Sequence, residues 1–452
     1  MAVASRQIQS RKWESRHLGE CADWLSGGTP FKGNPSFWTG SIPWISAKDM
    51  KSFRLHDAED HISDSAVGHG GKVVPAGTIL LLVRGMTLHN DVPISVTMRE
   101  MAFNQDIKAI RSKVGVDNLF LAYWLLAHKP DLLSAVDHAG HGTGRLLTDL
   151  LKKMVVSLPS PAEQKAIAQI LGALDEKIEL NRQMNATLEA QARALFQGWF
   201  VDFSPVRAKF DGRKPASLDA TTAALFPASF QKSRIGQIPK GWTVETFGDH
   251  ITAARGLSYK GEGLRDDGTG LPMHNLNSVY EGGGYKHEGI KFYAGEFREK
   301  HLVQPGDMIV TNTEQGFDHL LIGHAAIVPE RHGAKGLFSH HIYRVRPKPG
   351  SPFTPHYLVQ LFNNPRWHYW ISGFSNGTTI NMLPPDALEM PLLVVPPAEL
   401  IKKFSAFAES VHAQVEKNIT ESHTLAKLRD TLLPKLLSGE LSAVKIEEAA
   451  RA

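Results

Sequence analysis

The hydrophobic and polar positions of this 452-residue chain follow two patterns, of which the first is short and irregular. Apolar runs introduced by a glycine turn, at 77–83 and 306–310, predict buried strands. Amphipathic stretches at 118–128 and 355–362 predict short helices. Because strands and helices are mixed and joined by long loops, we expect a compact α/β domain on each side of the chain's middle.

The second pattern is a seven-residue repeat of apolar positions that begins at 162 and continues to 200 without a proline. Its two seam positions are occupied by Ile167, Leu174, Leu188 and Leu195, and by Leu171, Ile178, Ala192 and Trp199. A second seam is formed by Phe404, Val411, Leu425 and Leu432, with Ala408, Val415 and Leu436. About five heptads predict a coiled coil. At 1.5 Å per residue, its helices span roughly 57 Å.

Polar residues interrupt both seams at the middle. Asn181 and Asn185 stand in the first helix, and Asn418 and Ser422 stand at the corresponding places in the second. Polar seam residues fix register at a cost in stability. If the helices run antiparallel, one register pairs Asn181 with Ser422 and Asn185 with Asn418. The alternative is that these residues face solvent where the coil unwinds locally.

The chain contains two copies of one unit, which follow each other along the sequence. The segment 13–20 recurs at 242–249, an offset of 229 residues, and the later matches stay collinear up to 161–163 and 397–399, at an offset of 236. The predicted organisation is a first recognition-type domain at 1–158, a long helix at 159–203, a basic linker at 204–237, a second domain at 238–395, and a second long helix with a fraying tail at 396–452.

Composition narrows the class of protein. A hydrophobic fraction of 42% excludes wholesale disorder. No apolar run approaches the roughly 20 residues that cross a bilayer, and the start of the chain resembles no secretory signal. The single cysteine, Cys21, forms no intrachain disulfide. We therefore expect a cytoplasmic protein without a membrane partner.

The net charge of +4 is concentrated in one place. Residues 203–237 carry six Lys or Arg and two Asp, so this segment accounts for the whole excess and the two domains with their helices sum to zero. Since phosphate attraction scales with the phosphates neutralised, a neutral pair of domains is poorly suited to hold nucleic acid by charge alone. This charge distribution favours a protein that supplies base contacts and relies on partners for much of its affinity for nucleic acid.

Enzyme signatures are missing from the sequence. It contains no phosphate-binding loop, no nucleophile elbow, and no His or Cys spacing typical of a metal site. The run Asn364-Pro365-Arg366-Trp367 is a weak match to the N-P-P-[YF] site of amino-methyltransferases, but it lacks the second proline and is better explained by a turn that ends a helix. We therefore predict no catalytic residues and no metal site in a binding protein.

Corresponding loops of the two copies hold different side chains of the same chemical kind, interspersed with glycine. Arg, Lys, Asn, Gln, Ser and Thr are the residues that hydrogen-bond to base edges. The candidate DNA-binding residues are Thr29, Lys32, Ser46, Lys48, Arg84, Thr87, Asn104, Gln105, His141, Thr143, Arg145, Tyr259, Lys260, Asn275, Asn277, Asn312, Gln315, His340, His341, Asn376, Thr378, Thr379 and Asn381.

These motifs together carry a family resemblance. They are Ser26-Gly27-Gly28-Thr29-Pro30, Ile42-Pro43-Trp44-Ile45, Arg84-Gly85, Asn104-Gln105, Gly142-Thr143, the helical runs 159–167 and 174–178, the helix end 195–203, and Ile238-Pro239-Lys240-Gly241-Trp242. Their combination resembles the specificity (S) subunits of Type I restriction–modification systems over essentially the whole chain. The second copy departs from the pattern, because Ser339-His340-His341 replaces Asn-Gln and no Ser-Gly-Gly-Thr-Pro counterpart is evident near Arg255-Gly256.

The resemblance implies an α/β fold with two target-recognition domains, separated by two long helices in an antiparallel coiled coil with pseudo-twofold symmetry. Each domain would read one half of a bipartite, gapped sequence in double-stranded DNA, and the helix pair would set the spacing and dock the modification subunits. Two modification subunits and further restriction subunits would be the protein partners. S-adenosylmethionine, ATP and Mg²⁺ would be bound by those partners and no cofactor by this chain.

Two other functions stay open from the residues alone. A coiled-coil scaffold could bind proteins through its globular ends, which predicts no affinity for any duplex. A self-contained DNA methyltransferase or nuclease would act on DNA unaided.

Overall fold

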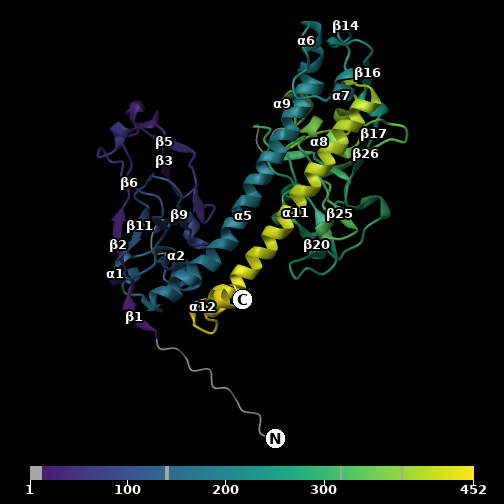
Figure 1. Cartoon of the computed structure of the whole chain (residues 1–452). Coiled ribbons are helices and arrows are strands. Elements are labelled where there is room, and N and C mark those ends of the chain that lie inside the picture. The colour runs from purple at the N-terminus through teal and green to yellow at the C-terminus, as the bar shows by residue number, and fades with distance from the viewer. Residues whose placement is uncertain (1–12, 138–141, 316–317, 378–379, 452) are drawn as a thin grey trace. The chain divides into compact units, whose positions relative to one another are not determined.

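The structure is a computed structural model that describes residues 13–137, 142–315, 318–377 and 380–451. The chain divides into two compact units (Figure 1). Unit 1 comprises residues 1–181 and 421–452, and unit 2 comprises residues 182–420. Among the described residues, no helix is both long and apolar enough to cross a membrane.

Unit 1 is built on two sheets that share a core. The five-stranded sheet has the order β2 (Ala22–Ser26), β11 (Ile107–Ser112), β7 (Ile79–Leu82), β9 (Ile94–Thr97) and β4 (Arg54–Leu55). The four-stranded sheet has the order β5 (Asp60–Ile62), β3 (Ile42–Ile45), β10 (Met101–Phe103) and β6 (Val73–Val74). Two-stranded ribbons pair β1 (Glu14–His17) with β13 (Val155–Leu158), and β8 (Arg84–Gly85) with β12 (Gly144–Arg145).

The predicted short helix of unit 1 is α2 (Asn118–Ala127), which packs against β9 and β11 (Figure 1). Asp117 caps it by accepting a hydrogen bond from the Phe120 amide at 2.8 Å, which satisfies a donor that the first turn leaves open. The remaining helices of the globular part are α1 (Leu18–Cys21), α3 (Lys129–Ser134) and α4 (Thr148–Lys152). The apolar run predicted as a strand at 77–83 is β7, whose four residues are all buried.

Unit 2 has a similar arrangement of two sheets and paired ribbons, although the numbers of strands in the corresponding sheets differ. One sheet has the order β17 (Ile251–Arg255), β26 (Ile342–Pro347), β22 (Met308–Thr311) and β24 (Ala325–Ile327). The other has the order β18 (Leu264–Arg265), β20 (Lys291–Tyr293), β19 (Leu271–His274), β25 (Gly336–Phe338) and β21 (Leu302–Val303). The ribbons are β16 (Thr243–Thr246) with β28 (Leu392–Val395), β23 (Thr313–Gln315) with β27 (Ile380–Met382), and β14 (Phe230–Ser233) with β15 (Gly236–Pro239). Helices α8 (Pro355–Phe362), α9 (Pro365–Ser372) and α10 (Asp386–Glu389) complete the domain.

The two long helices are α5 (Pro161–Phe196) and α11 (Ala398–Leu437). In unit 1, Asn181 donates to Ser422 Oγ at 3.2 Å and to Glu421 Oε2 at 2.8 Å. In unit 2, Asn418 donates to Asn185 Oδ1 at 2.7 Å. Both side-chain pairs expected from the sequence are thus in contact, and the numbering rises along one helix as it falls along the other. The helices pack antiparallel.

A charged network secures the helix pair within unit 1. Asp175 on α5 is 6% exposed and accepts hydrogen bonds from Arg429 of α11 at 2.7 Å and from the Tyr123 hydroxyl of α2 at 2.5 Å. Arg429 also pairs with Asp430, which faces solvent. The network therefore ties α2, α5 and α11 together around one buried carboxylate.

The segment 204–237 is folded, which corrects the prediction of a linker. It forms α6 (Ser204–Phe210), α7 (Ala220–Ala224) and most of the β14–β15 hairpin. Val206 and Phe226 are almost fully buried in the same core as Trp242. The sequence pattern missed this packing because the apolar residues are few and have no helical or strand periodicity.

The chain after Gly439 is also ordered, where the sequence predicts fraying. Residues Ala443–Arg451 form α12, and the Glu163 carboxylate accepts hydrogen bonds from the Ala443 amide at 2.6 Å and the Ser442 hydroxyl at 3.3 Å. A carboxylate at a helix N-terminus satisfies open amides and complements the helix dipole.

We predict that unit 2 is sensitive to acid, because burial lowers the pKa of several of its histidines, and the shift is large for four of them. Burial lowers the pKa of His274 to about 3, and those of His324, His332 and His356 to about 4, from 6.5, with help from neighbouring histidines. Since the unfolded chain takes up these protons below pH 6.5 and the folded chain does not, stability is present above pH 6.5 and is lost as the pH falls toward 4. Hydrogen exchange at pH 7.5 and pH 5 should show unit 2 opening more at pH 5.

His356→Gln removes one of these groups and should reduce the acid effect in unit 2. Peptides from α2 and β7 of unit 1 serve as the internal control. An acid effect confined to unit 1 would contradict the prediction.

Candidate nucleic-acid interface

Each unit has a corner where one turn leads from one of its two main sheets into the other. In unit 1 this turn is 104–106, between β10 and β11; in unit 2 it is 339–341, between β25 and β26. The chain that follows β2 or β17 crosses over the turn. Gly28 donates its amide to Phe103 O at 2.9 Å, and Leu257 donates its amide to Phe338 O at 2.8 Å.

A glycine makes this crossing possible in both units. A Cβ on Gly27 would lie 2.0 Å from Asn104 O, and one on Gly256 would lie 2.2 Å from Ser339 O, both far inside contact distance. The backbone can therefore approach this closely only without a side chain. Gly256 is thus the structural counterpart of Gly27, which the sequence comparison did not find because the flanking residues differ.

Besides the turn and the chain segment that crosses it, each corner contains a two-stranded ribbon. In unit 1, Val83 donates its amide to Asp106 O and Leu146 donates to Val83 O, both at 2.8 Å. In unit 2, Asn312 donates to His341 O at 3.0 Å and Leu383 donates to Asn312 O at 2.8 Å. The same backbone bonds thus align the β8–β12 ribbon with the β23–β27 ribbon, residue by residue.

The ribbon of unit 1 places two arginines side by side. Arg84 and Arg145 are directly opposite each other in the β8–β12 register, and both are exposed. Neither guanidinium makes a hydrogen bond or an ion pair with a side chain of the described residues. Like charges opposite each other on a ribbon destabilise it, so the pair is suited to an anion or to acceptor atoms supplied from outside.

A third cation of unit 1 lies at the same corner. Lys108 is opposite Ser26 in the last pair of β2 and β11, and its ammonium donates to the Ser26 hydroxyl. Burial lowers its pKa, and the nearby charges of Lys152, Lys72 and Arg145 lower it further. Like-charge crowding of this kind favours a negatively charged ligand.

Unit 2 has different side chains at the same positions. Thr313 replaces Arg84 and Met382 replaces Arg145 in the ribbon, as the shared backbone bonds align them. At the strand pair that carries Ser26 and Lys108 in unit 1, unit 2 has Arg255 opposite Tyr343. Arg255 reaches the Met382 sulfur at 3.8 Å. Both corners hold a cation, but the strand that carries it and the groups around it differ.

The structure separates the sequence-predicted contact residues by exposure. Those exposed are Lys32, Lys48, Arg84, Thr87, Gln105, Arg145, Lys260, Asn277, Gln315 and Asn376. Those half-buried are Thr29, Ser46, Thr143, Tyr259, His340 and His341. Those buried are Asn104, Asn275, Asn312 and Asn381. His141, Thr378 and Thr379 lie outside the described residues.

Several of the candidates meet at the corners. Thr29 donates to Gln105 Oε1 at 2.6 Å across the glycine crossing. In unit 2 the Tyr259 ring lies 6.2 Å from that of His340, which lies 3.9 Å from that of His341. Burial, with the charges of His340 and Arg255, lowers the pKa of His341.

Other candidates are engaged within the fold. Asn104 bonds to Asp106, Asn275 accepts from the Asn277 amide at 2.9 Å, and Asn312 donates to His340 O at 3.1 Å. Ser46 bonds to Asp49, and Lys48 pairs with Glu59 and Asp60 at 3.1 and 3.0 Å. The hydrogen bond to Asp60 raises the pKa of Lys48. These side chains hold turns and strands in place.

Lys108 and Arg255 are the residues at the corners that sequence reasoning missed. Both lie in strands, whereas the candidates predicted from the sequence lie in segments expected to be loops. In the described part of the chain, no group of three or more His, Cys, Asp and Glu side chains is arranged to hold a metal ion.

Known proteins share this organisation. The family model of the Type I restriction modification DNA specificity domain matches residues 10–190. The MjaIX Type I restriction enzyme specificity subunit of Methanocaldococcus jannaschii is 25% identical over 459 aligned residues, which cover 97% of this chain and 95% of that protein. A Type I restriction enzyme specificity subunit of Escherichia coli is 32% identical over 164 residues, or 36% of this chain and 41% of that protein.

A crystal structure shows the same fold. The Type I restriction-modification S subunit from M. genitalium has a TM-score of 0.56 and 14% sequence identity, over 96% of this chain and 98% of that chain. With two similar α/β units, a pair of long helices and a relative that aligns over nearly its whole length, this chain resembles the specificity subunits of Type I restriction–modification systems.

Proposed function

We propose that this chain is the non-catalytic subunit that recognises DNA sequence for a Type I restriction–modification complex. The observation that carries the proposal is the exposed Arg84–Arg145 pair, which has no acidic partner among the described side chains. An arginine can donate to O6 and N7 of guanine together, and it can also bind phosphate. Two adjacent arginines therefore suit a guanine-containing half-site.

The different chemistry of unit 2 supports a second, unlike half-site. Met382 is 37% exposed and presents a thioether methyl group where unit 1 presents the Arg145 guanidinium, and Thr313, in place of Arg84, is buried and bonded to His341. Apolar contact of this kind favours the thymine methyl group in the major groove. We propose that Arg255, Tyr259, Lys260, Asn277, Gln315, His340 and Asn376 supply contacts in unit 2, and that Lys32, Arg84, Thr87, Gln105, Lys108, Thr143 and Arg145 supply them in unit 1.

We assign the catalytic steps to partner subunits. Modification subunits, two in number, would bind S-adenosylmethionine, and restriction subunits would use ATP and Mg²⁺. The 36 residues of α5 correspond to about 54 Å of helix, longer than one duplex turn of about 34–36 Å. We propose that the helix pair sets the spacer of a bipartite target and carries docking sites for these partners.

The proposal is tested by reconstituting the full chain with Type I modification subunits and sequencing the methylated adenines on random DNA. The expected product is one gapped motif with two unlike halves. DNA methylation or cleavage by the purified chain alone would overturn the non-catalytic assignment. No affinity for any duplex, with or without partners, would favour the protein scaffold instead.

A further inference from the structure

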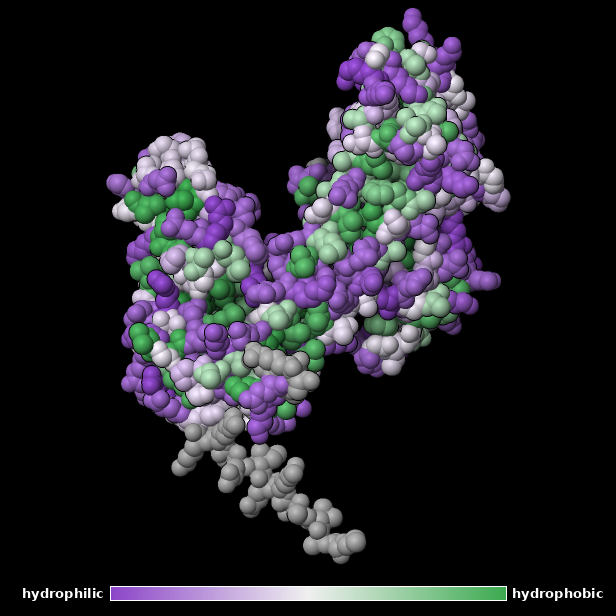
Figure 2. Space-filling model, in the orientation of Figure 1, coloured by the Kyte–Doolittle hydropathy of each residue, from purple (hydrophilic) through white to green (hydrophobic). Residues whose placement is uncertain are grey.

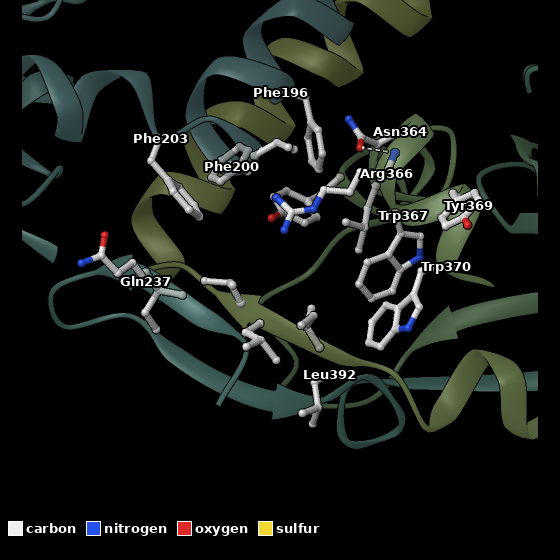
Figure 3. A pocket seen from close by; sticks show the side chains of 17 residues that line it. Phe196, Phe200, Phe203, Gln237, Asn364, Arg366, Trp367, Tyr369, Trp370 and Leu392 are labelled. Carbon is white, nitrogen blue, oxygen red and sulfur yellow. Dashed lines mark hydrogen bonds between the residues drawn. The ribbon is translucent and has the colours of Figure 1, made fainter. Parts of the chain in front are cut away.

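Unit 2 contains a pocket that has no part in the corner described above. It has a volume of about 430 Å³ and lies between the end of α5, helices α8 and α9, the β14–β15 hairpin and strand β28 (Figure 3). Hydrophobic residues gather over the α8 and α11 region on the face of unit 2 shown in Figure 2. The pocket walls are mainly aromatic and aliphatic, with Phe196, Phe200 and Tyr357 among them.

The mouth of the pocket exposes large aromatic side chains to solvent. Tyr369 is 82% exposed and Trp370 is 41% exposed, on successive positions of α9. Exposed aromatic groups beside an apolar cavity are typical of binding surfaces, since leaving them in water is unfavourable. Trp, Tyr and Arg are also the residues that contribute most to binding energy at protein interfaces.

Two polar groups in this pocket have no partner among the described residues. The Arg366 side chain extends into the space, and its guanidinium makes no hydrogen bond or ion pair with another side chain (Figure 3). Trp367 is 8% exposed, and its indole N–H is buried without an acceptor. A buried donor left without an acceptor is unfavourable. Both groups are hydrogen-bond donors, and a carboxylate can accept from both and also neutralise the charge of Arg366.

The backbone beside the pocket is irregular in two places. The last turn of α5 continues as a π-helical segment, Gln197–Val201, and Phe203 adopts a left-handed conformation with φ 54°. π-Helical turns are rare and occur mostly at functional sites, and a left-handed aromatic residue is strained. These distortions direct Phe200 and Phe203 into the pocket wall.

The internal repeat shows that the fold does not require these residues. Helix α9 corresponds to α3 at an offset of 235 residues, with Pro365 aligned to Pro130. Where unit 2 has Arg366, Trp367, Tyr369 and Trp370, unit 1 has Asp131, Leu132, Ser134 and Ala135. The Asn364-Pro365 pair has a structural role, because Asn364 caps the start of α9 by accepting from the Arg366 amide at 3.1 Å. The charged and aromatic residues after it are specific to unit 2.

We infer that this pocket is a docking site for a segment of a partner subunit that presents a carboxylate between apolar side chains. The carboxylate would pair with Arg366 and accept from the Trp367 indole, and the apolar side chains would fill the space between Phe200 and Trp370. Charge complementarity selects this occupant. The identity of the partner as a modification subunit rests on the proposed function, and the absence of these residues from unit 1 implies one such segment per chain.

The test measures assembly of the full chain with the modification subunits. The triple variant Arg366→Asp, Tyr369→Ser, Trp370→Ala gives α9 the unit 1 residues at these three positions and should weaken association at least tenfold. Arg366→Glu alone, at an exposed position, should weaken it in the same direction without affecting folding. Lys335→Glu, an exposed charge reversal elsewhere in unit 2, is the matched control and should leave association unchanged.

A photo-crosslinker identifies the occupant. With p-benzoylphenylalanine in place of Tyr369, crosslinks should map to a modification-subunit segment containing Asp or Glu next to aliphatic or aromatic residues. Wild-type association in both Arg366 variants, or crosslinks only to a second copy of this chain, would overturn the inference. The DNA preference of the assembled complex is measured separately, so that loss of sequence preference with intact assembly counts against the proposed function alone.

Discussion

Replacing Arg145 with Ser, in the full chain assembled with its modification subunits, is expected to weaken binding of one half-site by about 1–3 kcal/mol. The same change at Arg84 should have a similar effect, because the two guanidinium groups lie opposite each other on one ribbon. Removing either charge also removes cross-strand repulsion, so the free protein should melt at the same or a higher temperature. A drop in affinity together with unchanged or raised stability is the signature of a binding pair.

The measurement uses duplexes in which one half-site at a time is scrambled. The loss of affinity should be confined to the half-site that unit 1 reads. Replacing the guanines of that half-site with 7-deazaguanine should weaken binding by the wild type but not by the Arg145 variant. Arg111→Ser is the control, since Arg111 is exposed on β11 and lies opposite Asp23 in the strand register, at the end of the sheet away from the corner. Equal loss at both half-sites would show that the pair binds phosphate without reading bases.

Replacing Arg429 with Met is expected to lower the free energy of unfolding of unit 1 by roughly 3–5 kcal/mol. The reason is that Asp175 is 6% exposed and would keep its charge in a buried place without the cation. Urea unfolding followed by hydrogen exchange in unit 1 peptides measures the change without assuming that the whole chain unfolds in one step.

Asp430→Asn is the matched control for this prediction. Asp430 pairs with the same arginine but is 62% exposed, so its loss should cost at most about 1 kcal/mol. The double variant Asp175→Asn, Arg429→Met removes both charges and should recover part of the loss. If Arg429→Met and Asp430→Asn lowered the free energy of unfolding by the same small amount, the buried Asp175–Arg429 pair would contribute little to stability.

The repeat and the helix pair could be predicted because their signals are local or periodic. Heptads place Ile167 and Phe404 in a seam, and a single register brings Asn181 to Ser422 and Asn185 to Asn418. Segment 204–237 was misinterpreted because the burial of Phe226 depends on partners distant in sequence.

The corners could be predicted only in part. Arg84 and Arg145 were found as separate loop residues, but their pairing depends on a ribbon whose strands are 61 residues apart. Asn104 and Asn312 were equally plausible from sequence, since the amide that can contact a base can also fix a turn, and the structure uses both within the fold. Lys108 and Arg255 were missed because strand residues at a sheet end have no distinguishing local pattern.

The composition of unit 1 has a consequence for how the protein is made. Its core includes Leu433, Leu436 and Ala443 from the end of the chain, together with residues that begin near Leu18. Unit 2 is a continuous segment, so a ribosome completes it first, although domains are usually finished in order from the N-terminus. The first strands of unit 1 are therefore synthesised well before the residues that complete their core. During that interval we expect unit 1 to depend on chaperones more than unit 2 does.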